Sequence, residues 1–142
     1  MRDGKIFEIH RFMEIKKMSN IIVIVDDSRT IRNLLSKTLH AAGYTVRQAA
    51  DGVEGVQLVK SLVEAPAAII TDLNMPRMDG YNFISKIRIL ELTKRTPILV
   101  LTTETSQDKK ILARNAGATG WIVKPFTPEV LVRVVNRIIF EK

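Results

Sequence analysis

Five polar side chains in this sequence have the types and positions needed for charge chemistry. They are Asp26, Asp27, Asp72, Thr102 and Lys124, and each follows or ends a short apolar run. Two like charges about 4 Å apart repel by roughly 4 kcal/mol at an effective dielectric constant near 20. Three carboxylates brought together would therefore either take up a proton, with a raised pKa, or bind a metal ion. Carboxylate oxygens favour a hard cation, so we expect Mg²⁺, with Mn²⁺ as the alternative.

The chain contains two histidines and no cysteine. His10 lies near the amino terminus and His40 within a predicted helix, so a zinc site is not expected. The lack of cysteine excludes disulfide scaffolds and cysteine nucleophiles, and it fits a reducing compartment. We therefore expect a cytoplasmic protein. No stretch approaches 18 apolar residues, so no membrane span is predicted.

An alternation of predicted strands and helices places the five polar residues. Short apolar runs predict strands over 21–25, 45–49, 67–71, 97–102 and 119–123, with helical spacing after each. This order predicts a parallel sheet with helices on both faces, with the more polar second strand at an edge. Ligands bind beyond the carboxyl ends of the strands in such sheets. The five side chains fall at those ends and should therefore converge.

Each of these residues also has a simpler interpretation when it is taken alone. Asp26 and Asp27 could cap the first helix by accepting its free N–H groups. Asp72 could be an ordinary loop acid, Thr102 a hydroxyl at a strand end, and Lys124 a solvated amine. The combination favours a shared site, because all five residues fall at one edge of the predicted sheet.

Four segments resemble the receiver domain of two-component response regulators, most closely the stand-alone chemotaxis receivers of the CheY type. They are VDDS at 25–28, TDLNMPRMDG at 71–80, LTTE at 101–104 and AGATGWIVKPF at 116–126. The resemblance implies an α/β, doubly wound, flavodoxin-like fold with five parallel strands in the order 2-1-3-4-5. It covers residues 19–142, which we expect to form one receiver domain. Residues 1–18 are expected to be a leader outside the core.

The same resemblance implies a role for each acid. Asp72 is similar to the phosphoacceptor of the family. Asp26 and Asp27 are similar to the acidic pair that holds Mg²⁺, with Asp72 and the backbone carbonyl of Asn74 completing the ligands. The expected product is an acyl phosphate on Asp72, made from a phosphohistidine donor.

Further positions match the family in the same way. Thr102 and Lys124 are similar to the hydroxyl and the amine that bond the phosphoryl group, and Pro125 to a cis proline that aims the amine. Asn74 and Glu104 are expected to tune the access of the hydrolytic water, although both could be ordinary loop polarity.

The resemblance also suggests an output surface, and one position departs from the family pattern. Trp121 stands where the family usually has Tyr or Phe, and it either toggles as a switch or packs statically. The surface is expected on the helix at 106–115, the strand at 119–123 and the last helix. Residues expected to contribute to it are Ile111, Ala113, Trp121, Lys124 and the exposed side of 132–137.

The implied function is a single-domain receiver that switches its binding to a target rather than an enzyme in its own right. The implied partners are a histidine kinase of the CheA type, the flagellar motor switch or another protein target, and a phosphatase. A phosphorelay shuttle without a motor target is an alternative. We expect a monomer with no nucleic-acid or membrane partner.

Two other function classes find less support in the sequence. The net charge of +7 and the isoelectric point of about 9.9 would suit nucleic-acid binding, but the basic residues are scattered and fit solvated helix faces. An aspartyl phosphohydrolase would need an acid two residues after its nucleophile, where this chain has Asn74. A dinucleotide-binding enzyme is disfavoured because no glycine-rich turn follows the first strand.

Overall fold

A single five-stranded parallel sheet forms the centre of the computed structural model, which describes residues 19–141. The strand order is β2-β1-β3-β4-β5, as the predicted fold requires. The strands are β1 (Ile21–Val25), β2 (Thr45–Ala49), β3 (Ala68–Thr71), β4 (Ile98–Thr102) and β5 (Gly120–Val123). The polar β2 lies at an edge, as predicted. The predicted leader, residues 1–18, lies outside the described residues.

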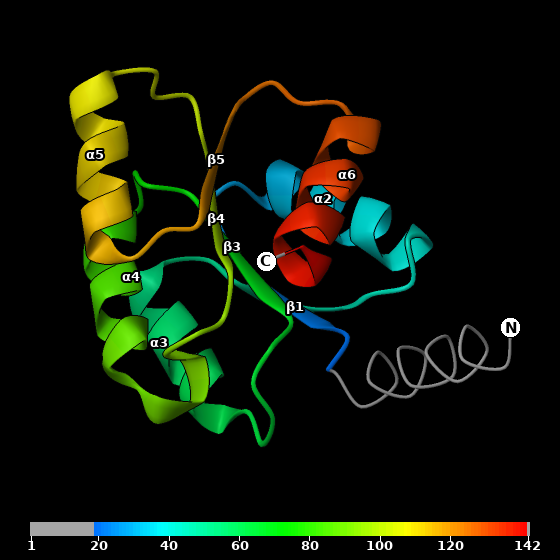
Figure 1. The fold of residues 1–142 in the computed structure, drawn as a ribbon, viewed down its shortest axis with the longest axis horizontal. Coiled ribbons are helices and arrows are strands. Elements are labelled where there is room, and N and C mark those ends of the chain that lie inside the picture. The colour runs from blue at the N-terminus through cyan, green and yellow to red at the C-terminus, as the bar shows by residue number, and fades with distance from the viewer. Residues whose placement is uncertain (1–18, 142) are drawn as a thin grey trace, which may run out of the picture.

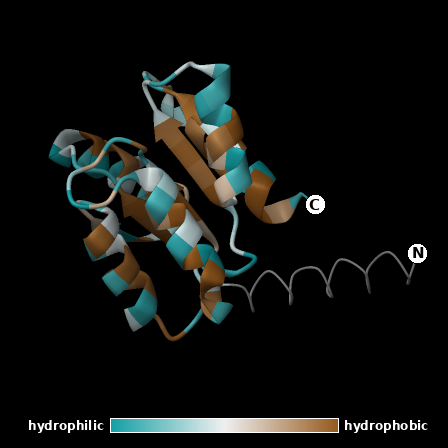
Figure 2. Ribbon diagram, turned by 90° about the vertical axis from the view of Figure 1, so that its left-hand side faces the viewer, coloured by the Kyte–Doolittle hydropathy of each residue, from teal (hydrophilic) through white to brown (hydrophobic). Residues whose placement is uncertain are grey.

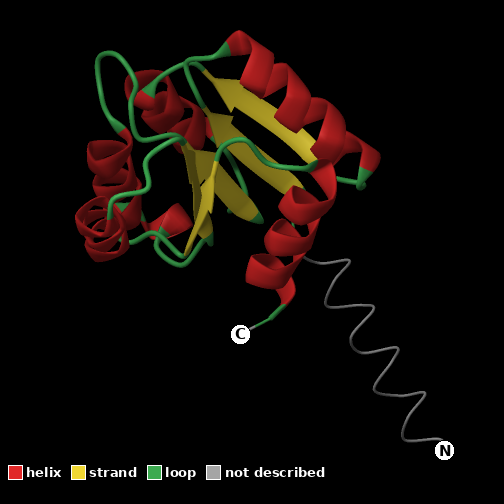
Figure 3. Ribbon diagram, turned by 90° about the horizontal axis from the view of Figure 1, so that it is seen from above, coloured by secondary structure: helices red, strands yellow, loops and turns green. Residues whose placement is uncertain are grey.

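Helices cover both faces of the sheet, as Figures 1 and 3 show. One face carries α2 (Arg29–Ala41) and α6 (Pro128–Phe140). The other carries α3 (Gly52–Ser61), α4 (Gly80–Ile89) and α5 (Gln107–Ala116). None of the helices between residues 19 and 141 is long and apolar enough to cross a bilayer.

The helical spacing predicted after the third strand does not extend to Leu90. The helix ends at Ile89, and Leu90 has an extended backbone with φ −72° and ψ 134°. A 3₁₀ turn, η1 (Glu91–Thr93), follows. The hydroxyl of buried Thr93 donates to the carbonyl of Ile87, which satisfies a carbonyl at the end of α4.

Strand alternation divides the core into two clusters. Successive side chains of a strand point to opposite faces, so Ile22 and Ile24 join one cluster while Val23 and Val25 join the other. The first cluster packs against Leu35 of α2 and the inner side of α6. The second packs against the three helices of the opposite face. Figure 2 shows the apolar colour of the strands between the helices.

The helix caps settle one of the alternatives left open by the sequence. Ser28 is the N-cap of α2, and its hydroxyl accepts from the N–H of Ile31 at 3.2 Å. Asp26 and Asp27 therefore do not cap this helix through the first-turn bond. The N-caps of α3 and α4 are Asp51 and Asp79.

Phe83 provides a test of the second cluster, because its side chain is fully buried on α4. Replacing it with alanine, Phe83→Ala, is expected to lower the free energy of unfolding by about 3–5 kcal/mol, since a large cavity remains. Phe140→Ala is the matched control, because Phe140 is 42% exposed, and it should cost less than about 1 kcal/mol. Urea unfolding followed by circular dichroism measures both. Equal losses in the two variants would contradict this account of the core.

Candidate functional site

Strand alternation also decides which side chains meet at the carboxyl edge of the sheet. Asp26 follows Ile24 by two residues, and Lys124 follows Ile122 by two. Asp72 has the same relation to Ile70, and all three isoleucines belong to the first cluster. Residues two apart on a strand share a face. Asp26, Asp72 and Lys124 therefore lie on the α2–α6 side of the sheet, where each can reach the others.

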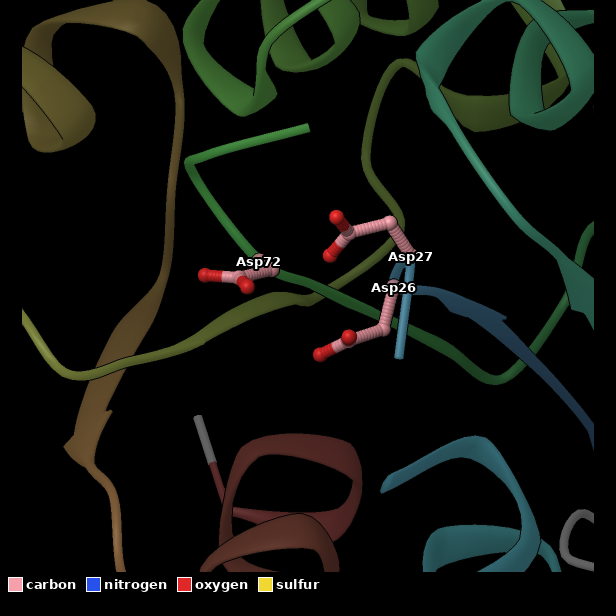
Figure 4. A group of neighbouring side chains, drawn as sticks. All are labelled: Asp26, Asp27 and Asp72. Atoms are coloured by element: carbon pink, nitrogen blue, oxygen red, sulfur yellow. The ribbon is translucent and has the colours of Figure 1, made fainter. Parts of the chain in front are cut away.

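The structure brings the three predicted carboxylates together. One oxygen from each of Asp26, Asp27 and Asp72 lies within 4.8 Å of the others. Figure 4 shows the three side chains grouped where β1 and β3 end. Asp26 and Asp72 are buried, at 1% and 9% exposure, whereas Asp27 is exposed. The group is thus open to solvent on the Asp27 side.

Lys124 enters this group as its internal cation. Its Nζ lies 2.9 Å from Asp26 Oδ2 and 3.2 Å from Asp72 Oδ2. Burial works to lower the pKa of the Lys124 ammonium, but the bonds and charges of Asp26 and Asp72 together outweigh it and raise that pKa. The amine is therefore charged at neutral pH. The three carboxylates still exceed it by two negative charges.

The surroundings of Asp26 act on the pKa of its carboxyl in opposite directions. Its burial raises the pKa of the carboxyl, and the nearby charge of Asp72 adds to this. The N–H of Ser28, 2.9 Å from Oδ1, and the ammonium of Lys124 act in the opposite direction. The guanidinium of Arg32 donates to the backbone carbonyl of Asp26 at 2.7 Å, which ties the end of β1 to α2.

Asp72 is fixed by the start of the loop that follows it. Its Oδ1 accepts from the N–H of Leu73 at 2.7 Å. The N–H of Gly80 donates to the carbonyl of Leu73 at 2.8 Å and so closes the base of the loop. A Cβ at Gly80 would collide with the carbonyl oxygen of Asp72, so this approach needs glycine. Asn74 is exposed in the same loop.

Thr102 lies at the site edge but bonds within its own loop. It follows Val100 of the second cluster by two residues, so alternation directs it away from the side where Lys124 lies. Its buried Oγ1 accepts from the N–H of Glu104 at 3.3 Å. Glu104 Oε1 in turn accepts from the N–H of Ser106 at 3.0 Å, at the start of α5. The Lys124–Pro125 peptide is cis.

The predicted output residues do not all reach the surface. Ile111 is exposed on α5, but Ala113 is only 1% exposed and packs in the second cluster. The prediction that Ala113 contributes to this surface was therefore wrong, because its position on α5 faces the sheet. Trp121 is half-buried against the same cluster, and Lys110 Nζ lies 5.9 Å from its ring centroid. No described residue accepts a bond from its buried Nε1.

Sequence reasoning missed several groups that support the site. Asp51 follows β2 at the same edge of the sheet, and the rule that identified the other acids would have included it. It pairs with Arg77, from which it is 26 residues away in sequence. The donors to Asp26 and Asp72 are the backbone N–H groups of Ser28 and Leu73, so no residue type marks them in the sequence.

The donor set suits a small divalent cation. It consists of carboxylate oxygens, the ligands that Mg²⁺ prefers. The charge excess of two over Lys124 matches a dication, and the carboxylate of Asp27 has no bonding partner within residues 19–141. Asp26, Asp27 and Asp72 would therefore provide the carboxylate ligands.

Comparisons with known proteins agree with this geometry. The response regulator receiver domain family matches residues 22–136. The sensor histidine kinase CheAY of Helicobacter pylori is 35% identical over 117 residues, which are 82% of this chain but only 15% of that protein. The structure of chemotaxis protein CheY4 of Vibrio cholerae is 45% identical, with a TM-score of 0.80, and the match covers 85% of this chain and 99% of that one.

A third match concerns the metal. The receiver domain of sensor histidine kinase PA1611 from Pseudomonas aeruginosa is 30% identical, with a TM-score of 0.78, over 86% of this chain and 98% of that one. That structure has a magnesium ion coordinated in the active-site cleft. The chain therefore belongs to the response regulator receiver domain family, and within it is similar to receivers of the CheY type.

Proposed function

We propose that this protein is a single-domain response regulator that accepts a phosphoryl group on Asp72 from a histidine kinase. Residues 19–142 form the receiver domain in this proposal. The observation that carries it is the convergence of Asp72 with Asp26, Asp27 and the ammonium of Lys124. A carboxylate beside a metal-ligating acid pair and a fixed cation has what phosphoryl transfer requires: a nucleophile, and positive charge opposite the transferred oxygens.

In the transfer, a carboxylate oxygen of Asp72 forms a bond to phosphorus while the bond from phosphorus to the kinase histidine nitrogen breaks. Mg²⁺ held by Asp26, Asp27, Asp72 and the carbonyl of Asn74, or Mn²⁺ in its place, would neutralise charge on the phosphoryl oxygens. Asp72 Oδ1 is held by the N–H of Leu73 at 2.7 Å. The other oxygen, Oδ2, is the one bonded to Lys124 and is the candidate nucleophile.

Lys124 and Thr102 contribute in different ways. The Lys124 amine already touches Asp72, so it can follow the negative charge from the carboxylate to the phosphoryl oxygens without a large movement. Thr102 lies at the same edge with its hydroxyl turned to Glu104. In the phosphorylated state its hydroxyl would exchange that bond for one to the phosphoryl group. Pro125 orients the segment that carries Lys124.

Hydrolysis returns the domain to its resting state. A water attacks phosphorus in line with the bond to Asp72, and no strong base is required of the protein. Asn74 is exposed in the loop that follows Asp72 and can meet that water. Glu104 is half-buried and bonded to Ser106, so it acts by shaping the side of the site across from Asn74. A phosphatase partner would enter on this open side.

We propose that the target binds to the surface formed by α5, β5 and α6. Phosphorylation then shifts the population between two arrangements of this surface. Trp121 is the aromatic group at its centre, and the unpaired buried Nε1 gives its indole a polar contact to gain on moving. The name CheAY of one relative fits a phosphodonor of the CheA type, and the relation to CheY4 favours the flagellar motor switch as target. This role places the protein in the cytoplasm, as a monomer.

The first prediction concerns the phosphoacceptor. Asp72→Asn is expected to abolish labelling by acetyl phosphate in the presence of Mg²⁺, because an amide oxygen is a far weaker nucleophile than a carboxylate. Asp79→Asn is the matched control, since Asp79 caps α4 and asparagine caps equally well. Intact-mass spectrometry counts the phosphoryl groups. Equal labelling of Asp72→Asn would refute the assignment.

The second prediction concerns the pH dependence of stability. Lys124→Met, measured without metal, should lower the free energy of unfolding at neutral pH by roughly 2 kcal/mol, because two buried carboxylates lose their charged partner. Without the amine the already raised pKa of Asp26 rises further. The folded variant then binds a proton more tightly than the unfolded chain does, so its deficit shrinks as the pH falls from about 8 to 5.

In the wild type the contribution of Lys124 is complete below the usual lysine value of 10.5 and disappears as the pH rises through its raised pKa. Thermal unfolding of both proteins in EDTA, from about pH 8 to pH 5, is the measurement. Lys109→Met removes an exposed charge from α5 as the control. A deficit that stays constant with pH would contradict the ion-pair account.

The third prediction separates the motor target from a phosphorelay shuttle. Beryllofluoride with Mg²⁺ mimics the phosphoryl group and should strengthen binding of a motor-switch peptide by at least about tenfold, which lies within the typical range of allosteric coupling. Fluorescence anisotropy of the labelled peptide measures it, with Asp72→Asn as the control. Unchanged affinity, with beryllofluoride uptake confirmed, would exclude the motor target and leave the shuttle.

A further inference from the structure

An ion pair that the proposed phosphoryl chemistry does not use holds the tip of the loop between β3 and α4. Arg77 Nε donates to Asp51 Oδ2 at 2.7 Å. The side chain of Asp51 is 8% exposed and that of Arg77 is 56% exposed. The pair joins the loop that follows the phosphoacceptor to the N-cap residue of α3, and Arg77 Nη2 also lies 4.0 Å from Oε2 of Glu54 in the first turn.

Asp51 is the fixed partner in this pair. Its Oδ1 accepts from the N–H of Glu54 at 2.9 Å, which caps α3. The bond from Arg77 is the main reason why the pKa of Asp51 lies below its usual value, so the carboxylate is charged. Both oxygens are thus engaged, one by the helix and one by the loop. The helix sets the position of Asp51, and Asp51 sets that of Arg77.

The backbone around Arg77 is also constrained. Its φ is 66°, a left-handed conformation that residues with a Cβ rarely adopt. The next residue, Met78, lies so close to α3 that a Cβ at Gly52 would be 2.7 Å from Met78 Cβ. The N–H of Met78 donates to the carbonyl of Pro76 at 2.7 Å. The loop tip is therefore seated on α3 in one specific turn.

The base of this loop is closed as well, by the bond from Gly80 to the Leu73 carbonyl at 2.8 Å. Between the closed base and the seated tip lies Asn74, whose carbonyl is the backbone ligand in the proposed function. We propose that Arg77 is a positioning residue: its bond to Asp51 restrains the loop that carries the Asn74 carbonyl and thereby strengthens Mg²⁺ binding. This inference rests on the proposed function and adds the means by which the fold sets metal affinity.

Simple electrostatics and positioning predict opposite results for Arg77. Removing a cation near an acidic site strengthens the binding of another cation, whereas loosening a ligand-bearing loop weakens it. For Asp51 the two effects have the same sign. In a variant that lacks both the Arg77 and the Asp51 charge, the two effects on the electrostatic attraction of Mg²⁺ cancel, whereas the loosening of the loop persists. The sign of the change in Arg77 variants therefore decides between the explanations.

The experiment is calorimetric titration of the full chain with MgCl₂. Arg77→Asn removes the guanidinium with a residue that tolerates positive φ, and Asp51→Asn keeps the helix cap but removes the charge. Each is expected to raise the Kd by about two- to fivefold, the range of a partly exposed ion pair, with no further loss in the double variant. Arg77→Lys should recover part of the affinity.

Arg137→Ala is the control, because it removes the same charge from an exposed pair with Glu141 in the last turn of α6. A second readout is labelling by acetyl phosphate: saturating Mg²⁺ should restore the rate of Arg77→Asn but not that of Asp72→Asn. Thermal unfolding in EDTA shows whether each variant folds, and Arg77→Gly, which also accepts a positive φ, takes the place of Arg77→Asn if that variant does not fold.

The outcomes are distinguishable. A Kd in Arg77→Asn equal to or lower than that of the wild type would overturn the positioning role and leave the proposed function intact. Additive changes that cancel in the double variant would also overturn it, in favour of electrostatics alone. A wild-type protein that takes up no Mg²⁺ would overturn the proposed function itself.

Discussion

The repulsion among three carboxylates at one edge of the sheet is the interaction on which the rest of the site depends. Asp26 and Asp72 are buried, and their chain positions give them no freedom to separate. Lys124 reduces the repulsion by bonding to both, but one charge cannot balance three. The remaining excess is what would attract a cation to this edge. Burial raises the pKa of Asp26, and the neighbouring charge of Asp72 adds to this rise.

The sheet produces this crowding through its most basic properties. Parallel pairing brings all carboxyl ends to one edge, and the register pairs Val25 with Thr71, so the acids that follow them are neighbours. Alternation then places Asp26, Asp72 and Lys124 on one side and Thr102 on the other. The strands β1, β3 and β4 are buried on both faces, and a shift by one residue would send each apolar side chain to the opposite cluster and draw the acids into the sheet.

The sequence predicted the strands well because their signal is local. The predicted bounds match β1 and β2 to the residue, and the other three strands began one residue later than predicted. The acids, Thr102 and Lys124 could be found because they stand at strand ends. Asp51 stands at such an end too and was omitted. The pairing of Asp51 with Arg77 could not be predicted, since it depends on how a loop folds over α3.

Two other features were beyond the sequence for the same reason. Ala113 was expected outside and packs inside, because the rotation of a polar helix is fixed by its neighbours and not by its own pattern. The end of α4 at Ile89 is accompanied by a bond from the Thr93 hydroxyl to the carbonyl of Ile87, which helical periodicity does not reveal. Periodicity predicts which elements form. It does not predict how the loops between them are held.

The position of Thr102 connects the acidic edge to the far face of the sheet. Asp26 and Asp72 lie on the side of the first cluster, while Thr102 follows Val100, which pairs in register with Trp121 in the second cluster. A hydroxyl that left Glu104 for a phosphoryl group on Asp72 would move across the sheet edge, away from the second cluster. The volume it vacated would adjoin the loop leading to α5. Trp121 packs against the same cluster, so a change in charge on one face has a steric route to the other.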